Sequence, residues 1–506
     1  MRGVETTGGR VAGQRVGGVW RFLCLRYGED TGGFRRFHAP QAARPRAGLY
    51  QAVSPGPSAP QAKVPQNTDP FFAWYSAIGA VSEDCLFLNL YTPALTGKRP
   101  VLVWLHGGGW TSYSGTAPGF DGSRLAAHED VVVVTLNHRL GVFGHLAFPD
   151  QPQFADSGNA GLLDIVLALE WLRDNIAAFG GDPGCVTLIG QSGGGAKVAA
   201  LMAMPAARGL FHRAALHSIG SALTVAEPDE AALVARGLGA ALGMDRLDPV
   251  TLQSLPMERL IAASAKAPPA RAMLDGRHLS THPFDGQAPA QAAGIPLLIG
   301  CTNTECSYYL RDDPANFTMD IATARRRLER FLDLPPRRVA MILDACRAAT
   351  PGLSPSDLLI LAASEQMFKR PAHAVAALQS ASARAPVFVW QFDWESPVEG
   401  GRMRGPHTVE LPFLFGSTAA AAACVGKGSP RMERLMMASW AAFARTGRPQ
   451  TILTPDWHPY DAADRWTMHL NDAPHLDRDP ADGPRALLSD LPFYRYGQSM
   501  ATLARD

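Results

Sequence analysis

The sequence has almost no excess of charge of either sign. Its 506 residues contain 47 Lys and Arg against 46 Asp and Glu, a formal net charge of +1. Proteins that bind nucleic acid or an anionic membrane surface through charge need a concentrated basic field or a polybasic segment. The composition offers neither, so we expect no nucleic-acid or membrane partner and a small, neutral or weakly charged substrate.

Long hydrophobic runs are missing as well. The N-terminal apolar run at 19–25 is interrupted by Arg21, and it is shorter than the core of a typical secretory signal. It is also far too short to span a bilayer. Later runs, such as 131–136, have the length of a buried strand. The chain is therefore expected to stay in the cytoplasm, where it is made.

Paired cysteines are absent too. The chain has seven cysteines, an odd number, and none of them forms a CxxC pair. This pattern argues against a disulfide framework and against a structural zinc site. Reduced thiols in a cytoplasmic protein are the expected state. The seven are Cys24, Cys85, Cys185, Cys301, Cys306, Cys346 and Cys424.

Short apolar runs alternate with amphipathic stretches along most of the chain. This alternation predicts an α/β fold with a central, mostly parallel twisted sheet and helices on both faces. Strands are expected at 86–91, 101–105, 131–136, 185–189, 213–218, 296–302 and 387–392, with short edge strands and loops in the first 65 residues. Helices are expected at 161–179, 194–204, 228–242, 320–332, 335–347, 356–370 and 432–446. We expect one domain over 1–506, in which an Ala-rich helical insertion at about 225–375 caps the sheet.

The clearest chemical motif is CVTLIGQSGGGAK at 185–197. It places Ser192 in a G-x-S-x-G pattern between an apolar strand and a helix, the context that this nucleophile motif requires. The turn is so sharp that side chains at Gly190 and Gly194 would clash, and the helix that follows directs N–H dipoles toward developing negative charge. The pattern predicts that Ser192 is a nucleophile.

A second glycine cluster, VLVWLHGGGW at 101–110, follows another buried strand. Glycine allows backbone N–H groups to approach a substrate carbonyl closely, as the oxyanion hole of an acyl-transfer enzyme requires. We expect these donors to be Gly108 and Gly109, joined by Gly193 after the nucleophile. A phosphate-binding loop is disfavoured because no GK[ST] follows. His106 is interpreted as structural.

A serine nucleophile also needs a base and an acid, which in this fold follow it along the chain. Position alone favours His407, in GPHTVELPFLFG, as the base and Glu305, just past an expected strand in LLIGCTNTECSYY, as the acid. Alternatives stay open at this point. The other histidines after the nucleophile are His212, His217, His278, His282, His373, His458, His469 and His475, and the competing acids are Asp275, Asp285, Asp312 and Asp313.

Together these motifs resemble the type-B carboxylesterase family, which includes the cholinesterases, over nearly the whole chain. Further matching segments are SEDCLFLNLYTP at 82–93, NHRLGVFGHL at 137–146, GNAGLLD at 158–164 and FHRA at 211–214. The resemblance implies an α/β-hydrolase fold and a Ser–Glu–His triad of Ser192, Glu305 and His407. It also implies structural ion pairs between Arg36 and Glu83 and between Arg139 and Asp164.

Several positions depart from the family pattern. Gln191 and Gly193 stand where Glu and Ala are frequent, which resembles the bacterial branch, and Cys306 and Thr408 stand where glycine is usual. Secreted relatives pair the cysteine of SEDC with one in a preceding CPQ, but this chain has APQ at 59–61. Cys85 therefore lacks that partner, in keeping with a reducing compartment.

The expected chemistry is ester hydrolysis through an acyl-enzyme on Ser192, with no metal or organic cofactor. The rate should fall at low pH as His407 takes up a proton. Two other readings stay open: a non-catalytic binding or adhesion-type relative, and amide, carbamate or acyl-transfer chemistry on the same triad. Trp110 and Phe143 are candidate pocket residues because they follow motif loops, although core packing is the favoured role of Phe143. The substrate and the oligomeric state are left open.

Overall fold

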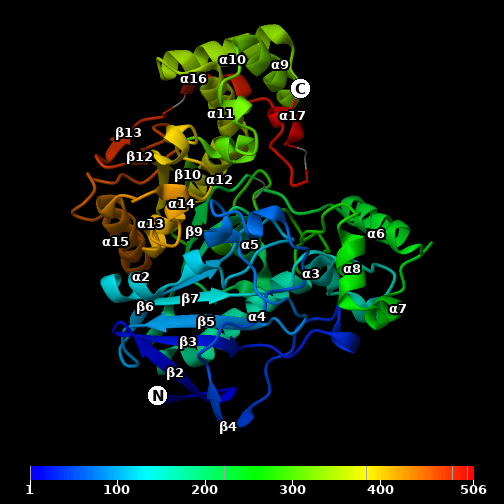
Figure 1. Ribbon diagram of the computed structural model, residues 1–506. Coiled ribbons are helices and arrows are strands. Elements are labelled where there is room, and N and C mark those ends of the chain that lie inside the picture. The colour runs from blue at the N-terminus through cyan, green and yellow to red at the C-terminus, as the bar shows by residue number, and fades with distance from the viewer. Residues whose placement is uncertain (1, 221–222, 383, 481, 498–499, 506) are drawn as a thin grey trace.

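The computed structural model of the protein describes residues 2–220, 223–382, 384–480, 482–497 and 500–505. Its centre is a sheet of thirteen strands within these residues, in the order β1-β2-β3-β5-β7-β6-β8-β9-β10-β11-β12-β13, with β4 paired to β2 (Figure 1). Neighbouring strands from β7 to β12 in this order run parallel, and the strands at both ends are antiparallel. The strands are β1 (Arg2–Thr6), β2 (Gly9–Val16), β3 (Val19–Arg26), β4 (Arg46–Gln51), β5 (Phe87–Thr92), β6 (Arg99–Leu105), β7 (Val132–Leu136), β8 (Gly181–Gln191), β9 (Arg213–His217), β10 (Leu297–Thr302), β11 (Val387–Phe392), β12 (Thr467–Leu470) and β13 (His475–Asp477).

Strand β6 shows why both faces of the sheet are covered. Successive side chains of a strand point to opposite faces. Val101 and Val103 lie in the core packed with α4 (Ala160–Asn175), α5 (Gly193–Ala203) and α12 (Arg370–Ala381). Leu102 and Trp104 lie in the core packed with α2 (Ser123–Glu129), α13 (Leu411–Phe415) and α15 (Pro430–Thr446). The predicted mostly parallel sheet between two helical layers is confirmed.

The helices between 225 and 375 form two separate groups because β10 returns to the middle of the sheet between them. The first group packs beside α3 (Gly141–His145) at the right of the view in Figure 1, and the second lies at the top of the view, next to the C-terminal segment. The expected insertion is thus divided in two. The first group is α6 (Pro228–Leu242), α7 (Pro249–Ser254) and α8 (Met257–Ser264); the second is α9 (Ile321–Leu332), α10 (Pro336–Ala349) and α11 (Pro355–Ser364), with α16 (Asp482–Leu488) and α17 (Ala501–Ala504) against it. The remaining short helices are α1 (Ala73–Ser76) and α14 (Ala422–Val425).

Two helical predictions differ from the structure by more than two residues at an end. The helix expected at 161–179 is α4 followed by a tighter 3₁₀ turn, η6 (Ile176–Phe179), which ends where Gly180 adopts a φ of 79°. The helix expected at 356–370 does not stop there. It passes from α11 through a π-helical turn, η11 (Glu365–Lys369), into α12 and ends at Ala381.

Both ion pairs implied by the family resemblance are present. Arg36 Nε donates to Glu83 Oε2 at 2.7 Å. Arg139 Nε donates to Asp164 Oδ2 at 2.9 Å, and the same carboxylate accepts the backbone N–H of Arg139 at 2.9 Å. The side chains of Arg139 and Asp164 are 2% and 0% exposed, so neither charge can be compensated by water.

Replacing Asp164 by Asn is therefore expected to destabilise the fold strongly. The guanidinium of Arg139 would stay buried without a counter-charge, a change that typically costs about 3–5 kcal/mol of unfolding free energy. Guanidinium-chloride unfolding at pH 7 measures this loss. The matched control is Asp174→Asn, which breaks an exposed pair with Arg173 and should cost less than about 1 kcal/mol. Equal losses in the two variants would contradict a special role for the buried pair.

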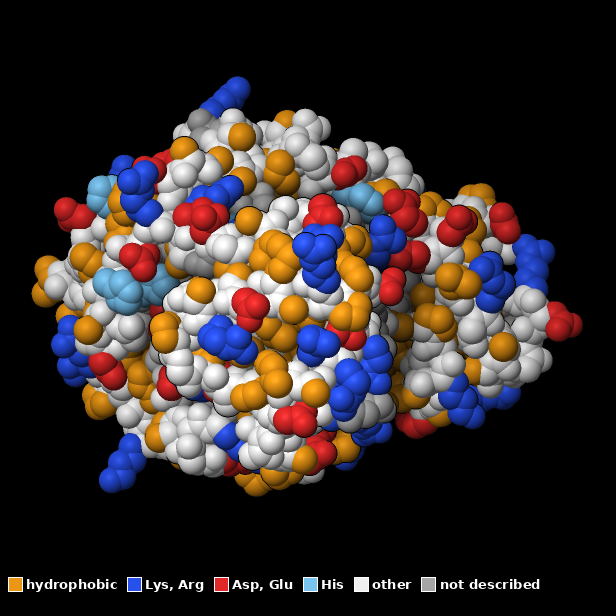
Figure 2. Space-filling model, turned by 90° about the horizontal axis from the view of Figure 1, so that it is seen from above, with side chains coloured by type: hydrophobic (Ala, Val, Ile, Leu, Met, Phe, Trp, Pro, Cys, Tyr) orange, Lys and Arg blue, Asp and Glu red, His pale blue; other side chains and the backbone are white. Residues whose placement is uncertain are grey.

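The surface carries charges of both signs. Lysine and arginine side chains are interspersed with aspartate and glutamate over the face seen from above (Figure 2). No helix within the described residues is long and apolar enough to cross a membrane.

Candidate functional site

Ser192 sits at the turn between β8 and α5, where the backbone adopts a conformation that is rare for a residue with a side chain. Its φ is 56° and its ψ is −123°. The turn is held by the N–H of Ser192, which donates to the carbonyl of His217 at 2.8 Å, and by the N–H of Ala196, which donates to the carbonyl of Ser192 at 3.0 Å. A strained residue of this kind persists only where its surroundings enforce it, and such residues cluster at functional sites.

The glycines around Ser192 are required by close backbone approach. A Cβ atom on Gly190 would lie 2.3 Å from the carbonyl oxygen of Gly194, inside the turn. A Cβ atom on Gly193 would lie 2.0 Å from the carbonyl oxygen of Gly109, so the nucleophile turn and the second glycine loop touch through their backbones. Gly108, Gly109 and Gly193 consequently border the same cavity as Ser192.

The predicted base and acid are in direct contact although they lie 102 residues apart. His407 Nδ1 is 2.5 Å from Glu305 Oε2. The other carboxylate oxygen, Oε1, accepts the Ser218 hydroxyl at 2.6 Å and the N–H of Thr302 at 2.7 Å. Three donors therefore surround Glu305, which is completely buried. This arrangement places the proton of the neutral imidazole on Nδ1 and leaves the lone pair of Nε2 available.

Within the described residues, the His407 ring contacts the side-chain amide of Gln191 and not the hydroxyl of Ser192. The amide nitrogen is 3.4 Å from Nδ1 and similarly close to Nε2, so it lies over the face of the ring and not along the in-plane lone pair. Gln191 Nε2 is 3.0 Å from His407 Nε2, while Gln191 Oε1 accepts the Tyr75 hydroxyl at 2.9 Å. Because Tyr75 occupies the amide oxygen, the NH₂ group is the end directed at His407. Catalytic hydrogen bonds are often formed fully only when substrate is bound, so this contact is compatible with a base that serves Ser192 later.

The departures from the family pattern have local explanations. Thr408 has a φ of 81°, in the region that glycine adopts without strain, which explains why glycine is usual after the histidine. Cys306 is completely buried, and its N–H donates to Ser364 Oγ at 3.0 Å. Where the family often has Glu before the serine, this chain has the neutral Gln191.

Other ionisable groups near the site are held neutral by burial. Burial lowers the pKa of His106 to about 3, and this ring stacks on His138, in keeping with its structural interpretation. Burial also lowers the pKa of His217 to about 3 and raises the pKa of Glu410 to about 8. His217 Nδ1 lies 3.1 Å from Glu410 Oε1, beside the Glu305–His407 pair but not part of it.

Ser192 and His407 open into a cavity of about 350 Å³ with aromatic walls. The walls come from several parts of the chain, among them α1, the glycine loops, the 3₁₀ turn η9 (Glu305–Leu310), the π turn η11, and the C-terminal segment after α16. The ring of Phe368 lies 5.1 Å from that of His407. The side chains that line the cavity are Tyr75, Tyr113, Ser192, Pro269, Tyr308, Tyr309, Met367, Phe368, His407, Tyr494 and Tyr496.

Trp110 and Phe143, the two candidate pocket residues, lie outside this lining and are only 2% and 3% exposed. Trp110 packs edge-on against His145, with ring centres 5.2 Å apart. Phe143 belongs to the apolar cluster beneath α6 and α8. The glycine loop turns Trp110 toward the core. Tyr496 lies beside the loop instead, and its hydroxyl accepts a hydrogen bond from the backbone N–H of Trp110 at 3.3 Å.

Lys197 is a charged residue of the site that the motif analysis did not single out. Its side chain is completely buried behind the glycine loop, and its Nζ donates to the carbonyls of Gly109 at 3.0 Å and His106 at 3.3 Å. Burial lowers its pKa to about 7. A lysine among apolar residues shortly after Ser192, in GGGAKVAAL, is the signal that could have identified it.

The sheet order, with the sharp turn at Ser192 after β8, Glu305 after β10 and His407 after β11, is that of an α/β-hydrolase. Comparison with known proteins agrees with this class. A carboxylesterase from Geobacillus stearothermophilus superposes with a TM-score of 0.82 at 34% identity, covering 96% of this chain and 99% of that one.

The sequence comparisons extend over the same length. Residues 2–483 match the model of the carboxylesterase family. A para-nitrobenzyl esterase of Bacillus subtilis is 34% identical over 96% of this chain and 98% of its own length. A phenmedipham hydrolase of Pseudarthrobacter oxydans is 33% identical over 92% and 94%. The chain belongs to the carboxylesterase family and is a carboxylic ester hydrolase, which confirms the function predicted from its motifs.

Proposed function

We propose that this serine carboxylesterase works through Ser192 as nucleophile, His407 as general base and Glu305 as the acid that orients it, with an oxyanion hole of Gly108, Gly109 and Gly193. The observation that carries the assignment is the 2.5 Å contact between His407 Nδ1 and the buried Glu305 carboxylate, in a cavity that Ser192 also borders. No cofactor is required by this chemistry.

The reaction follows from these positions. His407 Nε2 takes the proton of Ser192 Oγ while Oγ bonds to the ester carbonyl carbon, and the carbonyl oxygen becomes an oxyanion held by backbone N–H groups. The charged imidazolium is stabilised by Glu305. His407 then passes the proton to the leaving alcohol as the ester bond breaks. Water repeats the sequence on the acyl-enzyme and releases the carboxylic acid.

Gln191 can keep its place in the first step, because its amide lies against the face of the His407 ring and leaves the in-plane lone pair of Nε2 free for the Ser192 proton. We infer that Gln191 holds the His407 ring in place while the cavity is empty.

Lys197 supports the oxyanion loop from behind. Its two hydrogen bonds hold the carbonyls of His106 and Gly109, which lie on either side of the two peptide units that carry the N–H groups of Gly108 and Gly109, so the loop is fixed at both ends from behind. A residue that acts through the loop is a positioning residue, so its loss should affect kcat more than KM.

The variant Lys197→Met is expected to lower kcat about tenfold or more, less than loss of an oxyanion donor itself. With a pKa of about 7, Lys197 is cationic below that pH and loses its charge as the pH rises through it. The ratio of wild-type to variant kcat should therefore be largest below pH 7 and decrease toward pH 9.

Lys369→Met is the matched control, because Lys369 is also buried but donates to Asn303 away from the glycine loop. Its effect on kcat should be small and independent of pH. If the ratio of wild-type to Lys197→Met kcat stays constant from pH 6 to pH 9, the effect of the substitution comes from lost packing and not from the lost charge.

The cavity favours esters with one apolar, planar or short-chain part. Its volume of about 350 Å³ is at the small end of the range for small-molecule sites, and tyrosine and phenylalanine rings form its walls. The test is hydrolysis of p-nitrophenyl esters from acetate to decanoate, together with p-nitrobenzyl acetate and phenmedipham. An optimum at short chains is expected, and a rate that climbs steadily to decanoate would contradict the size argument.

The same series tests the two other readings. Stoichiometric labelling of the wild type by a fluorophosphonate, with turnover of any ester, excludes a non-catalytic binding protein. Matched ester and amide substrates separate esterase from amidase activity. A cytoplasmic location is part of the proposal and is supported by the seven free thiols of the chain.

A further inference from the structure

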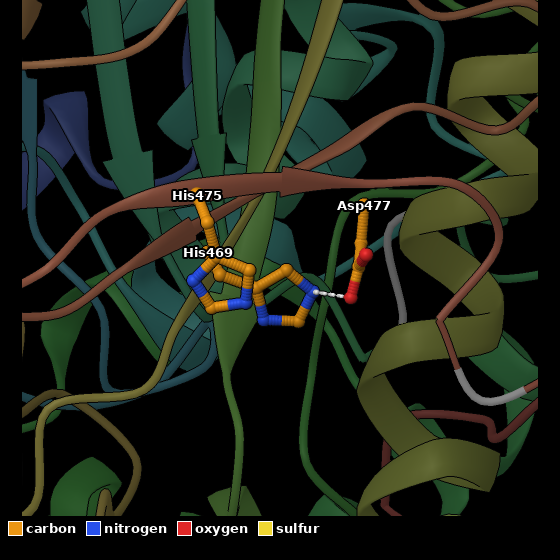
Figure 3. A group of neighbouring side chains, drawn as sticks. All are labelled: His469, His475 and Asp477. Atoms are coloured by element: carbon orange, nitrogen blue, oxygen red, sulfur yellow. Dashed lines mark ion pairs between the residues drawn. The ribbon is translucent and has the colours of Figure 1, made fainter.

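The hairpin β12–β13 brings two histidines and an aspartate to one face at the far edge of the sheet. His469 and His475 are direct cross-strand partners, and Asp477 follows His475 by two residues, so all three side chains point the same way. Their candidate ligand atoms lie within 4.8 Å of one another (Figure 3). The two imidazole rings are nearly parallel, with centres 4.7 Å apart.

His469 is arranged as a metal-binding histidine would be. Its Nδ1 contacts the carboxylate of Asp393. This carboxylate also accepts a hydrogen bond from the Gln391 side-chain amide at 2.8 Å, and the backbone N–H of Asp393 donates to the carbonyl of Leu470. This contact fixes the ring and leaves the lone pair on Nε2. The side chain is 9% exposed, yet Nε2 has no hydrogen-bond partner among the described residues and faces Asp477 Oδ2 at 3.9 Å.

His475 is oriented in the same sense. Its Nδ1 lies 3.4 Å from the carbonyl oxygen of Ala473, which places the proton on Nδ1 and the lone pair on Nε2. The unpaired Nε2 of His469, unlike that of the exposed His475, is buried, which is costly unless a ligand occupies it. A histidine whose second nitrogen is held by a carboxylate is a recurrent feature of metal sites, because the carboxylate makes the ring a stronger ligand.

The three residues border a second cavity of about 350 Å³, distinct from the one at Ser192. Among the described residues that line it, three are acidic (Glu365, Asp393 and Asp477) and one is a lysine, Lys369, which donates to Asn303 at 2.7 Å. Apart from the histidines, the ionisable lining is therefore mainly acidic and suits a cation.

We propose that His469 Nε2, His475 Nε2 and Asp477 bind a divalent transition-metal ion of the zinc type, with the remaining position open to the cavity. Two imidazoles and a carboxylate suit zinc, whereas magnesium and calcium prefer all-oxygen ligands. With metal–ligand bonds of about 2.0–2.2 Å, tetrahedral ligand atoms lie about 3.3 Å apart. His475 and Asp477, both exposed, can make this adjustment by rotating their side chains.

The site would fasten the end of the chain to the sheet. The hairpin pairs with β11, and the chain continues from it through α16 into the segment that carries Tyr494 and Tyr496 to the Ser192 cavity. No cysteine takes part, so a search for cysteine pairs does not reveal this ligand set.

The test is isothermal titration of the EDTA-treated, dialysed full-length protein with zinc chloride, and with magnesium chloride in parallel. Wild type should bind one zinc ion per chain and no magnesium, and saturating zinc should raise the melting temperature by a few degrees. His475→Ala removes one exposed ligand and should abolish both effects. Asp393→Asn keeps all three ligands but loses the oriented carboxylate, and should weaken zinc binding about 10–100-fold.

His128→Ala, an exposed histidine on α2, is the matched control and should titrate like the wild type. Zinc binding of equal strength in wild type and His475→Ala would mean adventitious surface binding and would overturn the proposal. The same holds if wild type shows no binding, or if Asp393→Asn binds as tightly as wild type while its melting temperature without metal is unchanged.

Discussion

Ser192→Ala is expected to reduce kcat for p-nitrophenyl acetate by about a million-fold, the scale seen when the nucleophile of a serine hydrolase is removed. Without Oγ no acyl-enzyme forms, and water would have to attack the ester directly. The oxyanion donors would remain, so a residual rate of about 10³–10⁴ over the uncatalysed reaction could persist. The measurement is initial-rate kinetics on ester, with fluorophosphonate labelling as an independent count of active serines.

The fold should tolerate this substitution. Alanine meets the same backbone strain at a φ of 56° as serine does, so the melting temperature should be close to that of the wild type. Ser439→Ala is the matched control, because Ser439 is also buried but lies on α15. Full labelling, or turnover within tenfold of the wild type, in Ser192→Ala would place the nucleophile elsewhere.

Glu305→Gln is expected to lower kcat about 10⁴-fold at neutral pH, as the equivalent acid-to-amide change does in a related triad. The structure determines how the amide would orient. Ser218 and Thr302 both donate to Oε1, so the amide oxygen belongs there and the NH₂ group faces His407 Nδ1. His407 would then carry its proton on Nε2 and could not accept that of Ser192.

Two further variants separate this explanation from a general loss of structure. Glu365→Gln alters another buried glutamate, one that pairs with Arg485, and should leave kcat within a fewfold of the wild type. Glu410→Gln tests the second buried carboxyl beside the site. If Glu305→Gln retained activity while Glu410→Gln lost it, Glu410 would be the acid of the triad.

Much of the sheet could be predicted from the sequence because its central strands are buried on both faces. Such strands are continuous apolar runs, and β11 has the expected ends, 387–392. The strand, turn and helix around Ser192 were predicted from local chemistry, since only glycine fits the close approaches at Gly190 and Gly194. The pairing of Glu305 with His407 came from family resemblance, because position alone left other acids and histidines open.

The cavity could not be predicted in the same way. Its walls combine Tyr75, Tyr308, Phe368 and Tyr496, which meet only through the fold. No periodicity links the C-terminal tyrosines to a glycine loop some 390 residues earlier, where Tyr496 bonds to Trp110. The orientation of Gln191 toward His407 likewise depends on Tyr75 at the other end of its amide.

The π turn η11 changes the direction in which side chains point along one long helical segment, α11–η11–α12. A π turn contains an additional residue relative to an α-helix, and each residue rotates a helix by about 100°. Met367 and Phe368 face the Ser192 cavity, Glu365 and Lys369 face the second cavity, and α12 beyond them packs Val375 onto the sheet. Deleting one residue here would turn α12 about its axis and withdraw that apolar face. The segment is therefore a point where length, more than side-chain identity, is constrained.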